Sequence, residues 1–104
     1  LKKAIHLTGG KSERVIVLSI PDWGCTPYAV DKNGAEIGVE IDSFNHVCDQ
    51  FSKKYHTGYI NITEETRAAR NNADTLASDQ LHYSGITHFK WATHLANYML
   101  KTCQ

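Results

Sequence analysis

The chain has 104 residues, 41% of them hydrophobic, and its 11 basic and 11 acidic side chains cancel. This length predicts a single domain over residues 1–104 with no internal boundary. The balanced charge argues against nucleic acid or an anionic membrane as the partner. No apolar run approaches the roughly 18 residues that span a bilayer, so we expect no membrane span.

The N-terminal third predicts a helix end, a strand and a loop. Residues 1–7 read as the tail of a helix that the glycines at 9 and 10 stop. Because the chain starts there and not at Met, we expect it to be cut from a longer protein. The β-branched run at 14–20 is typical of a strand buried on both faces, in a parallel sheet under helices. Pro21 ends the strand, and residues 21–34 are rich in turn formers.

A helix and a second strand follow. Apolar residues recur at steps of three and four between positions 37 and 55, which predicts a helix with one face on a core. Residues 58–62 predict a short strand. Strand, helix and strand then form a βαβ unit, whose crossover is almost always right-handed. The apolar positions of the helix are Ile41, Phe44, Val47, Cys48, Phe51 and Tyr55.

The last third predicts a polar segment and a long C-terminal helix. Residues 63–77 can hold a short helix before a loop. Ser84 can cap a helix over 87–101, because its hydroxyl can accept a free backbone N–H of the first turn. We expect one face of that helix to lie on the sheet. The apolar positions of this face are Phe89, Ala92, Leu95, Ala96 and Met99.

The topology predicts where functional groups gather. In an open parallel sheet they lie outside the carboxyl ends of the strands. The loop after the first strand carries Trp23, and the chain after the second strand leads to Asp79 and His82. Both segments leave the same sheet edge, so we expect Trp23 to lie towards His82. The three-residue spacing of Asp79 and His82 lets a carboxylate hold one imidazole nitrogen and leaves the other free as a base.

Three segments, 18–29, 41–45 and 77–85, resemble bacterial SGNH (GDSL-type) hydrolases in the right order. The resemblance extends from residue 18 to about residue 100. It implies a flavodoxin-like, three-layer α/β/α fold with a parallel sheet, of which this chain is the C-terminal half. It also implies a serine hydrolase that acts on a small ester without a cofactor.

By resemblance, Asp79 orients the ring of His82, and His82 is the general base towards the serine. Trp23 either lines an acyl pocket or only packs on the sheet edge. The family's Gly-Asp-Ser, Gly and Gly-x-Asn-Asp blocks do not occur in the 104 residues. The nucleophile is therefore expected upstream. Gln80 and Tyr83 stand where the family often has Gly and Pro.

Other polar residues are interpreted as structural. We expect Asp22 to turn its loop and Asn45 to make buried hydrogen bonds. The serines at 19, 43 and 84 lack the Gly-x-Ser-x-Gly elbow of a nucleophile. The three cysteines are widely spaced and odd in number, which favours reduced thiols. No pair of the six histidines has i, i+4 spacing beside a carboxylate, so we expect no metal ligands.

Three functions remain open from the sequence. The favoured one is the C-terminal part of a serine ester hydrolase. The alternatives are a non-catalytic α/β binding or interaction module and a small metal-binding protein. Because a half-sheet leaves a strand edge unpaired, we also expect the chain to bind its missing N-terminal half or to self-associate.

Overall fold

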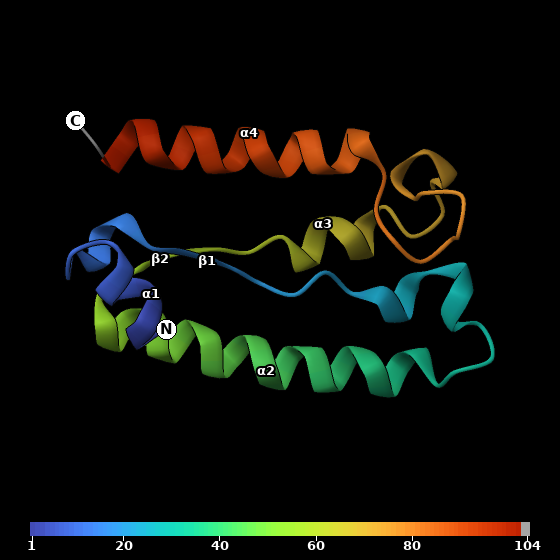
Figure 1. Cartoon of the computed structure of the whole chain (residues 1–104). Coiled ribbons are helices and arrows are strands. Elements are labelled where there is room, and N and C mark those ends of the chain that lie inside the picture. Colours follow the sequence, from blue (N-terminus) through green and yellow to red (C-terminus); the bar gives the residue numbers. More distant parts are fainter. Residues whose placement is uncertain (103–104) are drawn as a thin grey trace.

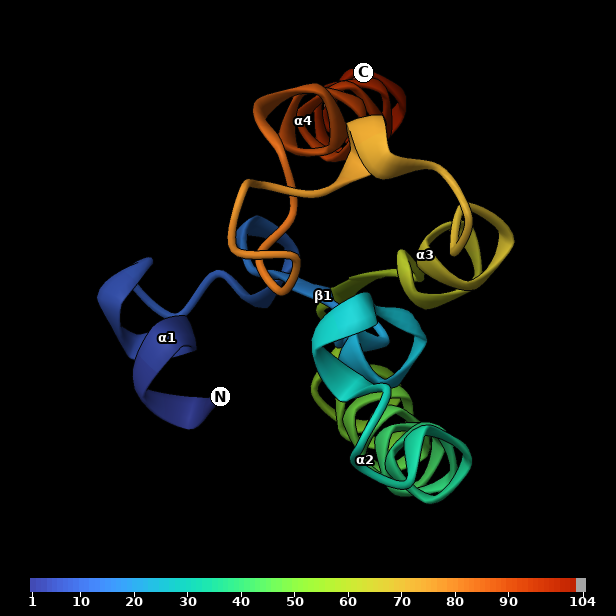
Figure 2. The same ribbon diagram turned by 90° about the vertical axis from the view of Figure 1, so that its right-hand side faces the viewer.

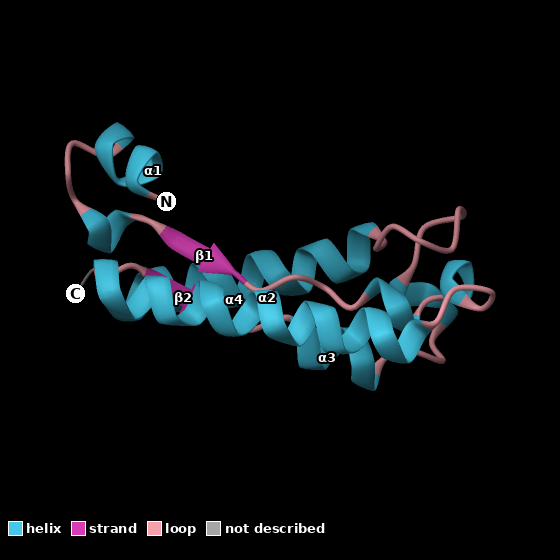
Figure 3. Cartoon of the chain, turned by 90° about the horizontal axis from the view of Figure 1, so that it is seen from below, coloured by secondary structure: helices cyan, strands magenta, loops and turns pink. Residues whose placement is uncertain are grey.

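Two short parallel strands lie between two long helices in the computed structural model, which describes residues 1–102 (Figures 1 and 3). The strands are β1 (Ile16–Leu18) and β2 (Gly58–Ile60), paired in parallel over three residue pairs. Helix α2 (Gly34–Tyr55) connects them and lies along one side, and α4 (Gly85–Thr102) lies along the other. The predicted strand–helix–strand unit with parallel strands is therefore confirmed.

The smaller elements surround this centre. Helix α1 (Lys2–Leu7) lies apart from the sheet, and α3 (Thr63–Ala68) follows β2 (Figure 2). Ser84 caps α4 as expected, because its Oγ accepts the backbone N–H of Thr87 at 3.4 Å. Between residues 1 and 102, four 3-10 turns occupy the loops: Ser12–Arg14, Trp23–Cys25, Pro27–Ala29 and Ala73–Thr75. None of the helices over residues 1–102 is both long and apolar enough to cross a membrane.

Both strands are shorter than the sequence predicts. After β1, the backbone N–H of Ile20 donates to the Asn45 side chain at 2.8 Å instead of to a neighbouring strand. After β2, the N–H of Ile62 donates to Ser19 Oγ at 2.7 Å. Polar side chains thus end the ladder that the apolar pattern would have continued. The expected burial on both faces of the first strand is also wrong, since Leu18 is 36% exposed.

The apolar face predicted for α2 is only partly buried. Ile41 is 5% exposed, but Phe44 is 64% and Phe51 45% exposed. Ser52, on the inward side, is 1% exposed. Ser52 comes eleven positions, about three turns, after Ile41, so the two lie on the same side of the helix, at one edge of the predicted apolar stripe. Periodicity located the stripe but not the part of it that meets the sheet.

The face predicted for α4 is wrong except at Leu95, which is half-buried. Phe89 is 74% and Met99 48% exposed, whereas Thr87 is 7% exposed. The inward side runs through Trp91 and Leu95 to Tyr98, at the same steps of three and four but turned around the helix. On this inward side the Trp91 ring packs against the Tyr83 ring, with the centroids 5.3 Å apart.

The buried interior holds little apolar material. Among residues 1–102, the buried hydrophobic side chains are those of Ala29, Ile41 and Ile62, and most other buried residues are serine or threonine. The radius of gyration is 15.1 Å, whereas a compact domain of this size has about 13 Å. The molecule measures 44 × 26 × 20 Å. Large apolar faces therefore stay on the outside of both long helices.

Candidate active site

Asp79 and His82 form a hydrogen-bonded pair in the turn before α4. Asp79 Oδ2 lies 2.5 Å from His82 Nδ1. The other carboxylate oxygen accepts the backbone N–H groups of Leu81 and His82, both at 3.0 Å. Because an ionised carboxylate can only accept hydrogen bonds, His82 Nδ1 is the donor. Nε2 of the neutral His82 ring then stays free. This is the arrangement that the spacing predicts.

The turn itself is tightly closed. The Ala77 N–H donates to the His82 carbonyl at 2.8 Å, and the Gln80 N–H donates to the Ala77 carbonyl at 3.0 Å. Gln80 has φ = 61°, in the left-handed region that favours glycine. The Tyr28 N–H donates to the Gln80 carbonyl at 3.3 Å, which holds the turn against the loop after β1.

The carboxylate of Asp79 is stabilised in its ionised form. Its pKa is lowered to about 2, first by the His82 hydrogen bond and then by the two backbone N–H groups. The side chains of Asp79 and His82 are 48% and 76% exposed. Local hydrogen bonds, not burial, therefore hold the pair in place.

Replacing His82 with alanine is expected to raise the pKa of Asp79 from about 2 towards its ordinary value of 3.8, because the largest cause of the shift is removed. The sign follows from the depressed pKa: any stability from this carboxylate is present above its unfolded value and is lost as pH falls towards 2. NMR titration of the side-chain carboxyl carbon measures the change. Asp31, whose pKa is lowered by Lys32, should titrate identically in both proteins. An unchanged pKa of Asp79 would contradict the hydrogen bond between Asp79 and His82.

An open, mostly apolar groove of about 520 Å³ lies beside His82. The loop after β1, the turn at 81–83 and the start of α4 all contribute to it. Trp23 and His82 line the same groove, so the shared sheet edge does bring them together. The lining residues are Ile20, Pro21, Trp23, Tyr28, Leu81, His82, Tyr83, His88 and Trp91.

His88 is a groove residue that the sequence reasoning missed. Its Nδ1 lies 2.9 Å from the Ser84 carbonyl, and its ring meets the Trp91 ring edge-on at 4.9 Å. A signal was present, because His88 comes one helical turn after the capping Ser84 and therefore returns to the same end of α4.

Tyr83 ties the turn to the rest of the site. Its hydroxyl donates to the Asp22 carbonyl at 3.1 Å, and its ring centroid lies 5.3 Å from that of Trp91. Burial raises the pKa of Tyr83. The residue in the position where proline is frequent in the resembled family thus joins the two loops.

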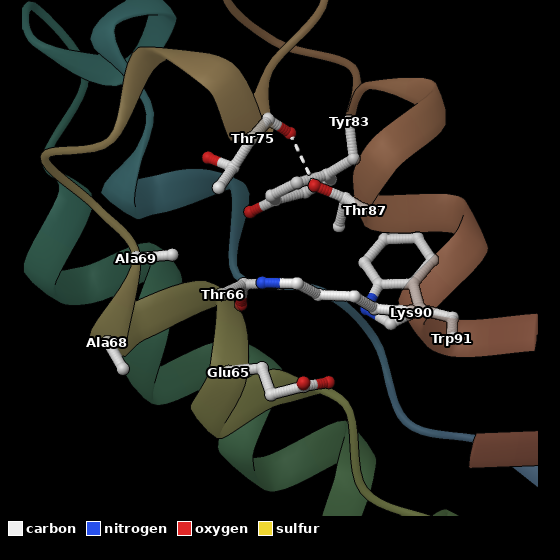
Figure 4. Close-up of a pocket in the computed structure, with 9 residues that line it drawn as sticks. All are labelled: Glu65, Thr66, Ala68, Ala69, Thr75, Tyr83, Thr87, Lys90 and Trp91. Atoms are coloured by element: carbon white, nitrogen blue, oxygen red, sulfur yellow. Dashed lines mark hydrogen bonds between the residues drawn. The ribbon is translucent and has the colours of Figure 1, made fainter. Parts of the chain in front are cut away.

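A second cavity, of about 290 Å³, shares two walls with the groove (Figure 4). Tyr83 and Trp91 line both. Thr87 Oγ1 donates to the Thr75 carbonyl at 2.8 Å at its rim. Charged Glu65 and Lys90 also line this cavity, which suits an apolar ligand less well than the groove.

The loop after β1 depends on one buried carboxylate. Asp22 is 3% exposed. Its Oδ1 accepts the Gly24 N–H at 2.9 Å, and its Oδ2 accepts from Arg67 Nε at 2.8 Å. Arg67 also binds Asp42 at 2.8 Å and Glu64 at 3.1 Å, and its pKa is raised mainly by the hydrogen bonds to Asp22 and Asp42. The predicted turning role of Asp22 is confirmed.

Asn45 makes structural hydrogen bonds as predicted, but the side chain is half-buried and not buried as expected. Its Oδ1 accepts the Ile20 N–H at 2.8 Å, and its Nδ2 donates to Thr63 Oγ1 at 2.9 Å. It thereby fastens α2 to the segments that follow both strands.

No serine of residues 1–102 lines the groove. Ser19 is 3% exposed and its Oγ accepts the N–H groups of Ile62 and Thr63. Ser43 Oγ donates to a carbonyl of its own helix, and Ser84 Oγ donates to the Asp74 carbonyl. The described residues therefore supply a base and a groove, but no serine in the lining of that groove.

Thiols and metal ligands do not gather at the site. Cys25 and Cys48 are free, and the pKa of Cys25 is raised mainly by burial. Cys103 lies outside the described residues. In the part of the chain from 1 to 102, no group of three His, Cys, Asp or Glu side chains could hold a metal ion.

Comparisons with protein-family models, with curated proteins and with solved structures give no match to this chain.

Proposed function

We propose that this chain is the C-terminal, acid–base part of a serine ester hydrolase of the SGNH (GDSL) type, with a three-layer, flavodoxin-like fold in the complete protein. The observation that carries the proposal is the bond between Asp79 Oδ2 and His82 Nδ1, at 2.5 Å. It leaves His82 Nε2 as the free nitrogen of a ring that lines an apolar groove. A serine from a segment outside these 104 residues completes the triad.

The chemistry begins with a proton transfer from that serine. His82 Nε2 takes the hydroxyl proton while serine Oγ forms a bond to the ester carbonyl carbon. When the bond from this carbon to the alcohol oxygen breaks, His82 gives the proton to that oxygen. A water molecule then repeats the two steps on the acyl-serine, which releases the acid and restores the serine. Asp79 stays ionised and stabilises the imidazolium form of His82.

The second candidate is a binding module without chemistry. It is favoured by the groove itself, because none of the described groove residues is a nucleophilic serine. A binding module would not need Asp79 to orient the imidazole of His82, whereas a hydrolase would. Ester hydrolysis by the full-length protein, measured with His82 and with alanine in its place, separates the two functions.

The exposed apolar faces of α2 and α4 also support the proposal that this chain is part of a larger fold. Phe44 on α2 is 64% exposed and Phe89 on α4 is 74% exposed, and the outer edges of β1 and β2 have no neighbouring strand within residues 1–102. We propose that the N-terminal half covers these faces in the complete protein. Alone, the chain has unpaired strand edges and a small core, which favour pairing with a second copy.

The isolated 104-residue chain is accordingly expected to self-associate at micromolar concentration. Light scattering over a dilution series measures its mass. Phe89→Lys should reduce the association, whereas Leu7→Lys, at the 77% exposed Leu7 of α1, is the matched control and should not. If the chain stayed a folded monomer at all concentrations, the proposal that the N-terminal half covers these apolar faces would be wrong.

A further inference from the structure

The groove contains two imidazole rings whose Nδ1 atoms are both occupied. His82 Nδ1 donates to Asp79, and His88 Nδ1 lies 2.9 Å from the Ser84 carbonyl oxygen. A carbonyl oxygen only accepts, so the neutral His88 ring carries its proton on Nδ1. Both rings line the groove, and each keeps Nε2 as a hydrogen-bond acceptor.

The remaining wall is apolar and largely aromatic. The rings of Trp23 and Tyr28 are tilted towards each other at 6.5 Å. The Tyr83 hydroxyl already donates its hydrogen bond to the Asp22 carbonyl. No Asp, Glu, Lys or Arg of residues 1–102 lines the groove. Flat aromatic walls favour an aromatic ring as the ligand, and the free acceptors favour one that carries hydrogen-bond donors.

The charges around the groove restrict the class of ligand further. Asp79 is ionised behind His82, with its pKa lowered to about 2 by that contact, and the groove residues offer no cation to balance a second negative charge. An anionic ligand would therefore be repelled. The volume, about 520 Å³, lies within the usual range of small-molecule sites, roughly 300–1,000 Å³.

We propose that the groove is the subsite for the leaving alcohol and that it takes an uncharged phenolic ring with a second hydroxyl group. The released phenol donates to His82 Nε2, and the second hydroxyl donates to His88 Nε2. His88 is thus a specificity-determining residue. This inference rests on the proposed function, because it assigns the groove to the alcohol that receives the His82 proton.

Binding is tested with three neutral probes in which a methoxy group replaces one hydroxyl donor at each step: resorcinol, 3-methoxyphenol and 1,3-dimethoxybenzene. The chain has two tryptophans, Trp23 and Trp91, and both line the groove. In NMR spectra of the full-length protein, the indole N–H signals of these two tryptophans should shift on titration with resorcinol. Loss of one donor should weaken binding by about fivefold. Benzoate, an anion of similar size, should bind more weakly than any of them.

His88→Phe keeps a ring against Trp91 and removes the acceptor. It should bind resorcinol and 3-methoxyphenol equally, whereas His46→Phe, on exposed α2 surface, should keep the discrimination. Equal binding of resorcinol and 1,3-dimethoxybenzene by the unmodified full-length protein, or tighter binding of benzoate, would overturn the inference.

Kinetics on the full-length protein give an independent readout. Resorcinol monoacetate should be hydrolysed with a kcat/KM about fivefold above that of 3-methoxyphenyl acetate, and His88→Phe should abolish this preference. Hydrolysis of both esters without a preference would overturn the groove assignment and leave the proposed function standing. Discriminating binding without any hydrolysis would overturn the proposed function, and with it the leaving-alcohol role of the groove, and would leave standing only the recognition of a dihydroxy ring by His82 and His88.

Discussion

Replacing His82 with alanine is expected to lower kcat for ester hydrolysis by the full-length protein by up to about 10⁶-fold. Without this imidazole the serine loses the base that Asp79 orients. The other groove imidazole, His88, is held at Nδ1 by the Ser84 carbonyl and not by a carboxylate that could stabilise its charged form. Asp79→Asn should lower kcat less, by about 10⁴-fold, because the His82 ring stays but its orientation and tautomer are no longer held. Stopped assays with p-nitrophenyl acetate measure both variants.

Matched controls make the result specific. His46→Ala changes an exposed histidine of α2 and should keep the full rate. The isolated 104-residue chain, which has no serine in the groove within residues 1–102, should show no saturable turnover. A His82→Ala protein with near-normal kcat would show that the Asp79–His82 pair is not the acid–base group.

Arg67→Ala is expected to be the most destabilising single change, by about 3–5 kcal/mol in the free energy of unfolding. Arg67 is the partner of the Asp22 carboxylate, whose side chain is 4% exposed. Removing the guanidinium leaves a buried charge unpaired and frees the loop that presents Trp23. Chemical denaturation followed by circular dichroism measures the loss.

Two further variants separate this cause from a general sensitivity to arginine loss. Arg70→Ala, one turn away, removes an exposed side chain whose contact is the Cys25 thiol at 3.7 Å. It should change the unfolding free energy by less than about 0.5 kcal/mol. Adding Asp22→Asn to Arg67→Ala removes the unpaired charge and should recover part of the stability. Equal unfolding midpoints for Arg67→Ala and the unmodified chain would disprove the role of the pair.

The sequence by itself determined the features that depend on neighbours close along the chain. The Asp79–His82 bond is one, because both partners and the backbone N–H groups that hold the carboxylate lie within four residues of each other. The positions of α2 and α4 and the parallel pairing of β1 with β2 are others, because periodicity and a long helical connection suffice to predict them.

Only the tertiary structure decided the features that join distant segments. Arg67 meets Asp22 across 45 positions, and the Tyr83 hydroxyl meets the Asp22 carbonyl across 61; no local pattern marks such partners. The inward face of α4 was likewise decided by what it packs on. Both sides of this helix carry apolar residues, and Trp91 rather than Phe89 fits the space beside Tyr83. His88 joined the groove for the same reason, because the orientation of α4 places it there.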